Sequence, residues 1–377
     1  MSRVFESCGF EYMVLRPIQY GRDGDPVLLA ARKEYLGAET TTVELRPLHV
    51  THETSVKVRA RLSEEVQLSN FMRHRNIGKV LGYAVEGTQP YLVLEHMPGC
   101  SLETVLDASA LVNRKVSVGF AVAIALAIAD VLDHAHRCAD EAGRPLHLVH
   151  RSVSPANIQI SQRGQVRLVN FGSAYSELIG RYRTSTGLLR GDAAYIAPEV
   201  LREFQTPRKQ RHASARTPPD KRADIFSLGL VLLGEITGWH PLDPPDSLED
   251  EVSAFVLPGT RVETEPAIPL EILTARLLNF RSKDVDRATR RLAERLRRII
   301  AKALQVEPSA RYQGALAMVD DLRGYMRDSW PKYHEGEVAA EMAALIRAAR
   351  KLDEHVAYGV TEPGILPTPV DVLGSVP

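Results

Sequence analysis

The amino-acid sequence predicts an α+β protein in which a small strand-rich lobe precedes a larger helical lobe. Short apolar or β-branched runs, separated by Gly, Pro or charged turns, dominate the chain up to about residue 97. After Pro98-Gly99 the pattern changes to apolar residues at helical spacing. A run of strands followed by a run of helices is typical of an α+β fold. With 377 residues, the chain is long enough for one large bilobal domain.

The small lobe, residues 1–97, is expected to contain several strands and one helix. The strands are expected at residues 12–18, 27–30, 41–45, 78–85 and 90–94. Residues 54–72 carry apolar side chains at helical spacing with charges between them, and these side chains are Val56, Val58, Leu62 and Val66. This pattern predicts an amphipathic helix that lies on the sheet.

The large lobe, residues 98–329, is expected to be mainly helical. Helices are expected at residues 101–106, 118–135, 225–237, 285–303 and 315–326. A C-terminal helical segment is expected at 330–356, with an Ala-rich amphipathic helix at 335–349. The last residues, 357–377, are predicted to be a disordered tail, because residues 361–377 include four prolines.

Composition excludes some classes of partner and favours a cytoplasmic protein. Lys plus Arg equals Asp plus Glu at 47 each, so the chain has no bulk preference for nucleic acid or anionic membrane. The cysteines Cys8, Cys100 and Cys138 lie far apart, which favours reduced, buried thiols over a disulfide framework. We expect no membrane insertion, because we find no apolar run near the roughly 18–20 residues that span a bilayer.

One stretch, from His150 to Gly172, carries the most specific motif. It reads His-Arg-Ser-Val-Ser-Pro-Ala-Asn-Ile and then, twelve residues after this Ile158, Asn-Phe-Gly. Downstream come Gly-Asp-Ala-Ala-Tyr-Ile-Ala-Pro-Glu at 191–199, Asp-Ile-Phe-Ser-Leu-Gly at 224–229, and Arg311. In this order and spacing, the motifs resemble those of protein kinases, in particular bacterial, myxobacterial-type serine/threonine kinases. The resemblance covers roughly residues 12–327 and implies a bilobal protein-kinase-like fold.

The resemblance also implies that the carboxylates of phosphoryl transfer are missing. Ser152 stands at the position of the catalytic base, and Asn170 stands where a magnesium-binding Asp is usual. Asn157, the second metal-ligand position, is retained, but two asparagines supply no charge. Loss of a positioned base typically lowers the rate by on the order of 10²–10⁴, and Mg²⁺ prefers anionic oxygen ligands.

A glycine-bearing loop and a charged pair are the implied phosphate-binding elements. Gly21 and Gly24 match two glycines of the loop whose backbone N–H groups approach the phosphates. Arg46 stands where the family has a lysine, and Glu65 lies at the spacing of the helix carboxylate that pairs with it. We expect an Arg46–Glu65 ion pair to clamp helix to sheet; the alternative is two independent surface charges.

The implied base pocket is altered on both faces. Glu95 and Met97 fall in a hinge-like stretch at residues 94–97. Glu44 replaces the small residue that covers the adenine, and Gln159 replaces an apolar residue below it. A carboxylate against an apolar base is either desolvated or turned away, so adenine binding is expected to be weak.

Asp192 supports a further hypothesis about the degenerate base position. It stands where serine/threonine kinases usually carry a Thr near the catalytic base. We predict that its carboxylate faces Ser152 and partly replaces the missing one. The alternative is a hydrogen bond from Ser152 that only ties the loop down.

Two segments are candidate regulatory sites. A basic, proline-bearing insertion near 204–222 is expected to be a surface loop that docks an acidic partner, receives phosphate at Ser214 or Thr217, or is simply solvated. Residues 184–186 (Thr-Ser-Thr) are candidate phosphoacceptors for another kinase, and phosphate there can pair with Arg151.

Together these observations predict a catalytically impaired pseudokinase that acts as a signalling scaffold or allosteric binding module. It is expected to require no cofactor and to bind protein partners, such as a signalling kinase or its substrate. The alternatives are an unconventional serine/threonine kinase that uses ATP and Mg²⁺, and a nucleotide sensor without turnover.

Overall fold

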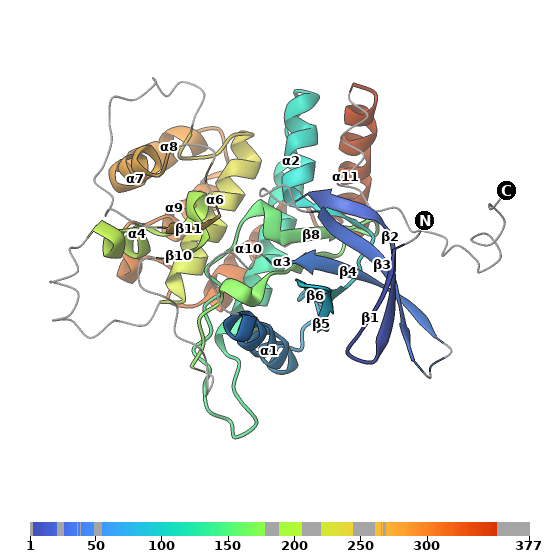
Figure 1. Cartoon of the computed structure of the whole chain (residues 1–377). Coiled ribbons are helices and arrows are strands. Elements are labelled where there is room, and N and C mark those ends of the chain that lie inside the picture. Colours follow the sequence, from blue (N-terminus) through green and yellow to red (C-terminus); the bar gives the residue numbers. More distant parts are fainter. Residues whose placement is uncertain are drawn as a thin grey trace, which may run out of the picture.

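The computed structural model describes residues 3–20, 26–35, 37, 39–48, 55–177, 188–205, 220–243, 261–264, 266 and 269–352. The strands β1–β4 lie at one end of the molecule and the helices α4, α7 and α8 at the other (Figure 1). The predicted α+β fold, with a small strand-rich lobe and a larger helical lobe, is confirmed.

A six-stranded antiparallel sheet in the order β1-β2-β3-β4-β6-β5 forms the small lobe. Its strands are β1 (Val4–Ser7), β2 (Phe10–Tyr20), β3 (Pro26–Glu34), β4 (Thr40–Pro47), β5 (Val80–Glu86) and β6 (Gln89–Glu95). The sequence predicted all of them except β1, whose four residues are too few to show a clear alternation.

The first strand brings the two edges of this sheet together. Ser7 Oγ on β1 accepts a hydrogen bond from the Val85 N–H on β5 at 2.9 Å. Arg3 forms an ion pair with Glu86, and it donates to the Tyr91 hydroxyl at 2.8 Å. The sheet is therefore curled into a nearly closed barrel. An apolar cluster that shares one face of the curled sheet consists of Tyr12, Leu28, Ala30, Val43, Leu45, Ala84, Tyr91 and Val93.

The helix of the small lobe, α1 (Ser55–Phe71), packs against β5 and against the short 3-10 helix η2 (Phe171–Ser173). The side chains of Val56, Val58 and Leu62, which were expected on its apolar face, lie outside the described residues. Val66 is only half-buried, whereas Glu65 and Leu68 are buried.

The large lobe is built around three long helices. The central helix α3 (Val118–His136) contacts α6 (Arg222–Thr237) and α10 (Ala315–Ser329), and the three share one apolar core. Around them lie α2 (Leu102–Leu111), α4 (Pro198–Gln205), α7 (Leu270–Asn279), α8 (Ser282–Thr289) and α9 (Glu294–Ala303).

The single helix predicted at residues 285–303 is wrong, because α8 and α9 are separate. The Thr289 hydroxyl donates to the Val285 carbonyl at 2.7 Å, and the Leu292 N–H donates to the Thr289 carbonyl at 2.8 Å. The first bond lies within the last turn of α8, and the second closes a turn after Thr289, beyond which α9 begins and contacts α8.

Two expectations about apolar and thiol residues need correction. By length and composition, α3 could cross a membrane, although no such run was expected from the sequence. In the structure, 67% of its most apolar window is buried inside the protein, so α3 is the core helix of the large lobe. Cys100 and Cys138 are buried as expected, but Cys8 is exposed.

The C-terminal helix α11 (Glu335–Arg350) lies along α2 and α3. Its buried face consists of Val338, Met342, Leu345, Ile346 and Ala349. The Glu341 carboxylate accepts from the Ser117 N–H at 2.5 Å and from the Tyr333 hydroxyl at 2.8 Å. Because Ser117 caps α3, these bonds join α11 to the start of the core helix.

A small three-stranded sheet positions the motif residues. It has the order β7-β8-β9, with β7 (Gly99–Ser101), β8 (Ile158–Ser161) and β9 (Val166–Leu168). Asn157 directly precedes β8, and Asn170 follows two residues after β9. The antiparallel pairing of β8 with β9 therefore brings the two asparagines to the same end of a hairpin.

Candidate functional site

Asp224 on α6 holds the loop that begins at His150. Its carboxylate accepts from the backbone N–H groups of His150 and Arg151, each at 2.8 Å, and from His136 Nε2 at 2.8 Å. Burial alone would raise the pKa of Asp224, but the hydrogen bond from His136 and the backbone donors hold the pKa below its usual value. These bonds fix Arg151 in a left-handed backbone conformation with φ 64°.

His150 links this loop to the Asn-Phe-Gly segment. Its ring stands edge-on to Phe171, with ring centroids 4.5 Å apart. The Ser152 N–H lies 3.2 Å from Nδ1, and Nε2 lies 3.1 Å from the Val169 carbonyl oxygen. Burial lowers the pKa of His150 to about 4, so the ring is neutral, with Nδ1 accepting and Nε2–H donating.

Ser152, Asn157 and Asn170 form a continuous chain of neutral hydrogen bonds. Asn157 Nδ2 donates to the carbonyl oxygen and to Oγ of Ser152, both at 2.8 Å. Asn170 Nδ2 donates to Asn157 Oδ1 at 3.2 Å. The three residues predicted at the base and metal positions are thus brought together, but their polar atoms bind one another. Within the part of the chain that the structure describes, no group of three or more His, Cys, Asp or Glu side chains could hold a metal ion.

Asp192 lies close to this chain on β10 (Leu188–Asp192). The preceding residue, Gly191, packs directly on the loop, because a Cβ there would lie 1.9 Å from the Arg151 carbonyl oxygen. Asp192 Oδ1 accepts from the Ala194 N–H at 3.1 Å and so caps the next short helix. Direct replacement of the missing carboxylate by Asp192 stays a prediction.

The cleft between the lobes is crossed by charged side chains from both of its walls. Its lining residues are Glu44, Met72, Gly78, Lys79, Val80, Leu94, Glu95, Met97, Gln159, Arg167, Val169, Asn170 and Phe171. Glu44 Oε1 lies 3.0 Å from His96 Nδ1, and both side chains are largely buried. Glu44 has therefore turned towards the hinge, which is one of the two outcomes expected for a carboxylate at this position.

A second ion pair holds the hinge to the floor of the cleft. Arg167 Nη1 on β9 donates to Glu95 Oε2 at 2.9 Å. Lys79 Nζ lies 4.0 Å from the other Glu95 oxygen. The hinge residue Glu95 thus joins the two lobes through its side chain.

The predicted pair of Arg46 and Glu65 is not formed. Arg46 lies on β4 opposite Leu92, and among the described residues no hydrogen bond or ion pair joins it to Glu65. The Glu65 carboxylate instead lies over the Asn-Phe-Gly segment, because a Cβ on Gly172 would stand 2.9 Å from Glu65 Oε2. Gly21 and Gly24 lie outside the described residues, as do residues 184–186 and most of the basic insertion.

Sequence reasoning missed the roles of His96 and Arg167, which are the partners of the cleft carboxylates Glu44 and Glu95. A charged residue at the centre of the short run Val166–Leu168 was the available signal for Arg167, since a strand below a base pocket is otherwise apolar. His96 gave no signal, because its partner Glu44 is distant in the sequence.

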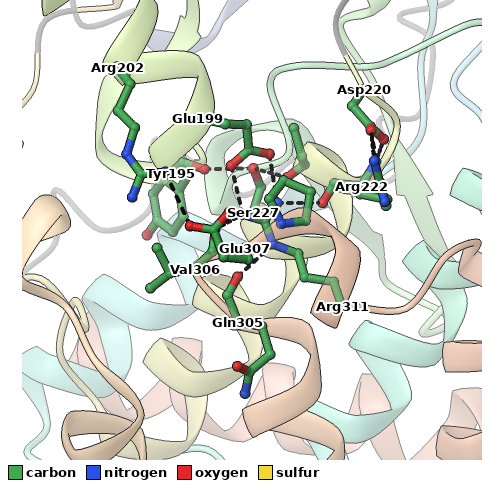
Figure 2. A network of polar contacts seen from close by, with 12 residues as sticks. Tyr195, Glu199, Arg202, Asp220, Arg222, Ser227, Gln305, Val306, Glu307 and Arg311 are labelled. Atoms are coloured by element: carbon green, nitrogen blue, oxygen red, sulfur yellow. Dashed lines mark hydrogen bonds and ion pairs between the residues drawn. The ribbon is translucent and has the colours of Figure 1, made fainter.

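A buried ion pair braces the large lobe below the site. The Arg311 guanidinium donates to both Glu199 oxygens, at 2.7 and 2.6 Å. Its remaining N–H groups donate to backbone carbonyls, and Figure 2 shows these bonds to Gln305, Val306 and Arg222. Every donor of this fully buried guanidinium is satisfied, as a buried charge requires.

Comparisons with known proteins agree with this architecture. The model of the protein kinase domain matches residues 42–321, so the chain belongs to the protein kinase family. It is 29% identical over 267 residues to the tyrosine-protein kinase MasK of Myxococcus xanthus, covering 70% of this chain and 35% of MasK. It is 27% identical over 284 residues to the serine/threonine-protein kinase PksC of Streptomyces coelicolor, covering 74% of this chain and 43% of PksC. The chain thus spans less than half the length of these curated relatives.

Proposed function

We propose that this chain is a pseudokinase: a kinase fold that serves as a signalling scaffold or allosteric binding module in the cytoplasm. The observation that carries the proposal is the hydrogen-bonded chain of Ser152, Asn157 and Asn170. These residues stand at the base and metal-ligand positions of the family, yet they carry no charge and are bonded to one another.

The neutral chain works against both parts of phosphoryl transfer. The Ser152 hydroxyl accepts a bond from the neutral Asn157 amide, and a hydroxyl cannot act as a base at neutral pH without a basic neighbour that removes its proton. Mg²⁺ keeps its waters unless carboxylates or phosphates replace them, and Asn157 Oδ1 already accepts from Asn170. This bond uses a lone pair of the Asn157 oxygen, and neither asparagine brings the negative charge that Mg²⁺ prefers.

The cleft supports the same proposal. An adenine ring entering below β4 would meet the Glu44–His96 pair, whose separation would leave a carboxylate against an apolar base. The retained parts are those that hold the large lobe together: the Asp224 bonds and the Arg311–Glu199 pair. A kinase fold that keeps these stabilising contacts but lacks the catalytic carboxylates fits a role in binding protein partners, such as a signalling kinase or its substrate.

The intact frame also favours a second candidate, an unconventional ATP-dependent kinase. Asp224 holds the backbone of the His-Arg loop, and His150 packs on Phe171, so the frame is kept although Ser152 and Asn170 stand at the carboxylate positions. The relatives MasK and PksC are named as kinases. A nucleotide sensor without turnover lies between the two candidates.

Thermal unfolding with and without ATP and Mg²⁺ or Mn²⁺ separates these functions. A ligand that binds only the folded state raises its stability by RT ln(1 + [L]/Kd). The pseudokinase proposal predicts no metal-dependent shift at millimolar nucleotide and no transfer of radiolabelled phosphate to itself or to a general substrate.

The control is the double variant Ser152→Asp, Asn170→Asp, which restores both carboxylates. It is expected to gain a metal-dependent thermal shift, which shows that the assay detects binding in this fold. Phosphate transfer by the wild-type chain that disappears in Asn157→Ala would overturn the proposal in favour of the kinase. A shift without transfer would favour the sensor.

A further inference from the structure

Two distant segments form a small parallel sheet beside the degenerate catalytic loop. β10 (Leu188–Asp192) pairs with β11 (Arg261–Thr264), a segment between α6 and α7. Leu188 lies opposite Arg261, and Asp192 lies opposite Thr264. Within the described residues this sheet has no third strand.

β10 is held firmly at its C-terminal end. Gly191 has φ 86° and packs on the Arg151 carbonyl oxygen, so any side chain there would collide with the loop. Asp192 caps η3 (Ala193–Tyr195), and the Ser227 hydroxyl donates to the Tyr195 carbonyl at 2.6 Å. β10 is thus fixed both to the catalytic loop and to the core helix α6.

β11, by contrast, is attached to β10 by a weak arrangement. Parallel pairs are slightly less stable per residue than antiparallel pairs, and an isolated two-stranded sheet is marginal in water. The pairing is also interrupted by a register shift between Leu189 and Asp192. A fixed strand whose edge is covered by a short, weakly paired segment is suited to strand exchange.

We infer that β11 covers, in cis, an edge of β10 that accepts an extended peptide from a partner protein. The incoming segment would lie parallel to β10 and replace β11 by strand addition, in which main-chain bonds give affinity and alternate side chains give specificity. The occupant itself, Arg-Val-Glu-Thr, indicates the chemistry that fits: β-branched residues alternating with charged ones, and no proline within the run. The inference rests on the proposed binding function and identifies the edge of β10 as the surface that binds the partner.

The test uses a fluorescein-labelled synthetic peptide that copies residues 258–267 of this chain. In the wild-type protein β11 belongs to the same chain as β10 and competes with the added peptide at an effective concentration on the order of millimolar. The double variant Arg261→Pro, Val262→Pro removes two successive N–H groups, and one of them faces β10 whichever side the pairing uses. The variant is expected to bind the peptide at least ~10-fold more tightly than wild type, measured by fluorescence anisotropy.

Two controls make this result specific. Glu141→Pro adds a proline at an exposed turn far along the chain from β11, and it is expected to behave like wild type. A peptide that carries the same two prolines is expected not to bind the double variant. Equal affinity of wild type and double variant, or no binding to the double variant, overturns the inference.

A second measurement on the wild-type chain does not depend on the variant folding. In hydrogen exchange with excess peptide, the amides of 261–264 are expected to lose protection while those of 188–192 keep it. Unchanged protection of both segments overturns the inference. Both assays are run without nucleotide, so their failure leaves the test of phosphoryl transfer untouched.

Discussion

At the scale of single residues, the sequence predicts the position of a site residue where a motif fixes its spacing. It does not predict which side chain that residue contacts when the contact depends on how the strands pair. The positions of Ser152, Asn157 and Asn170 follow from motif spacing, and the structure brings the three together. The partner of Glu44 could not be predicted, because His96 reaches it only after β6 pairs with β4. The same holds for Glu65, which lies over Gly172 rather than beside Arg46.

Glu44→Ala is expected to open the cleft to nucleotide. The change removes a carboxylate from the place where a base would lie and releases His96. Weak binding of ATP without metal is expected to strengthen by at least ~10-fold, or about 1.4 kcal/mol. Titration of a fluorescent ATP analogue at constant salt measures the change.

The matched control for this experiment is Glu34→Ala. It removes a carboxylate at the exposed end of the neighbouring strand β3. An equal gain in both variants would mean that net charge, and not the Glu44–His96 pair, keeps nucleotide out.

At the scale of elements, the strands and helices with a long periodic pattern were predicted, and the short or paired ones were not. β1 and β11 are four residues each, too short for a clear alternation, and the partner strand of β11 is distant in the sequence. The break between α8 and α9 was missed because the apolar spacing continues through it, while the turn is closed by a backbone bond from Leu292 to Thr289.

The close contact between the β8–β9 turn and α11 is expected to stabilise the position of α11. Gly164 has φ 81°, and a Cβ there would stand 1.7 Å from the Glu335 carbonyl oxygen at the start of α11. Gly164→Ala must therefore displace α11 in addition to straining the turn, and a loss of about 2–4 kcal/mol in the free energy of unfolding is expected. Urea denaturation measures this loss.

Gly143→Ala separates backbone strain from the contact. Gly143 also has a positive φ, 75°, but nothing lies within 4 Å of its added Cβ. This variant is expected to lose only about 1 kcal/mol. If the two variants lose the same amount, α11 does not depend on the close approach at Gly164.

At the scale of the whole molecule, the centre of the large lobe holds a charge arrangement that depends on pH. His150 is fully buried, and burial lowers its pKa from 6.5 to about 4. The unfolded chain therefore binds a proton at this residue below pH 6.5, whereas the folded chain does so only near pH 4. Stability from the neutral ring is present above pH 6.5 and is lost as the pH falls towards 4.

The expected loss from this single group is on the order of 3 kcal/mol between these two pH values. His150→Asn removes the titrating group, so its unfolding free energy should fall less steeply over the same range. Urea denaturation of both proteins at several pH values measures the difference in slope. Parallel curves would show that His150 does not control stability over this pH range.

The closure of the small-lobe sheet has a consequence for how the chain is made. Ser7 on the first strand meets Val85 on β5, so the two edges of the sheet cannot join until the chain has been made over the 78 positions that separate these residues. Contacts between residues so far apart in sequence slow folding, because the intervening loop must close first. The strands β1 to β4 can pair in the order in which they are made, whereas the small lobe is completed only after β6 has paired with both β4 and β5.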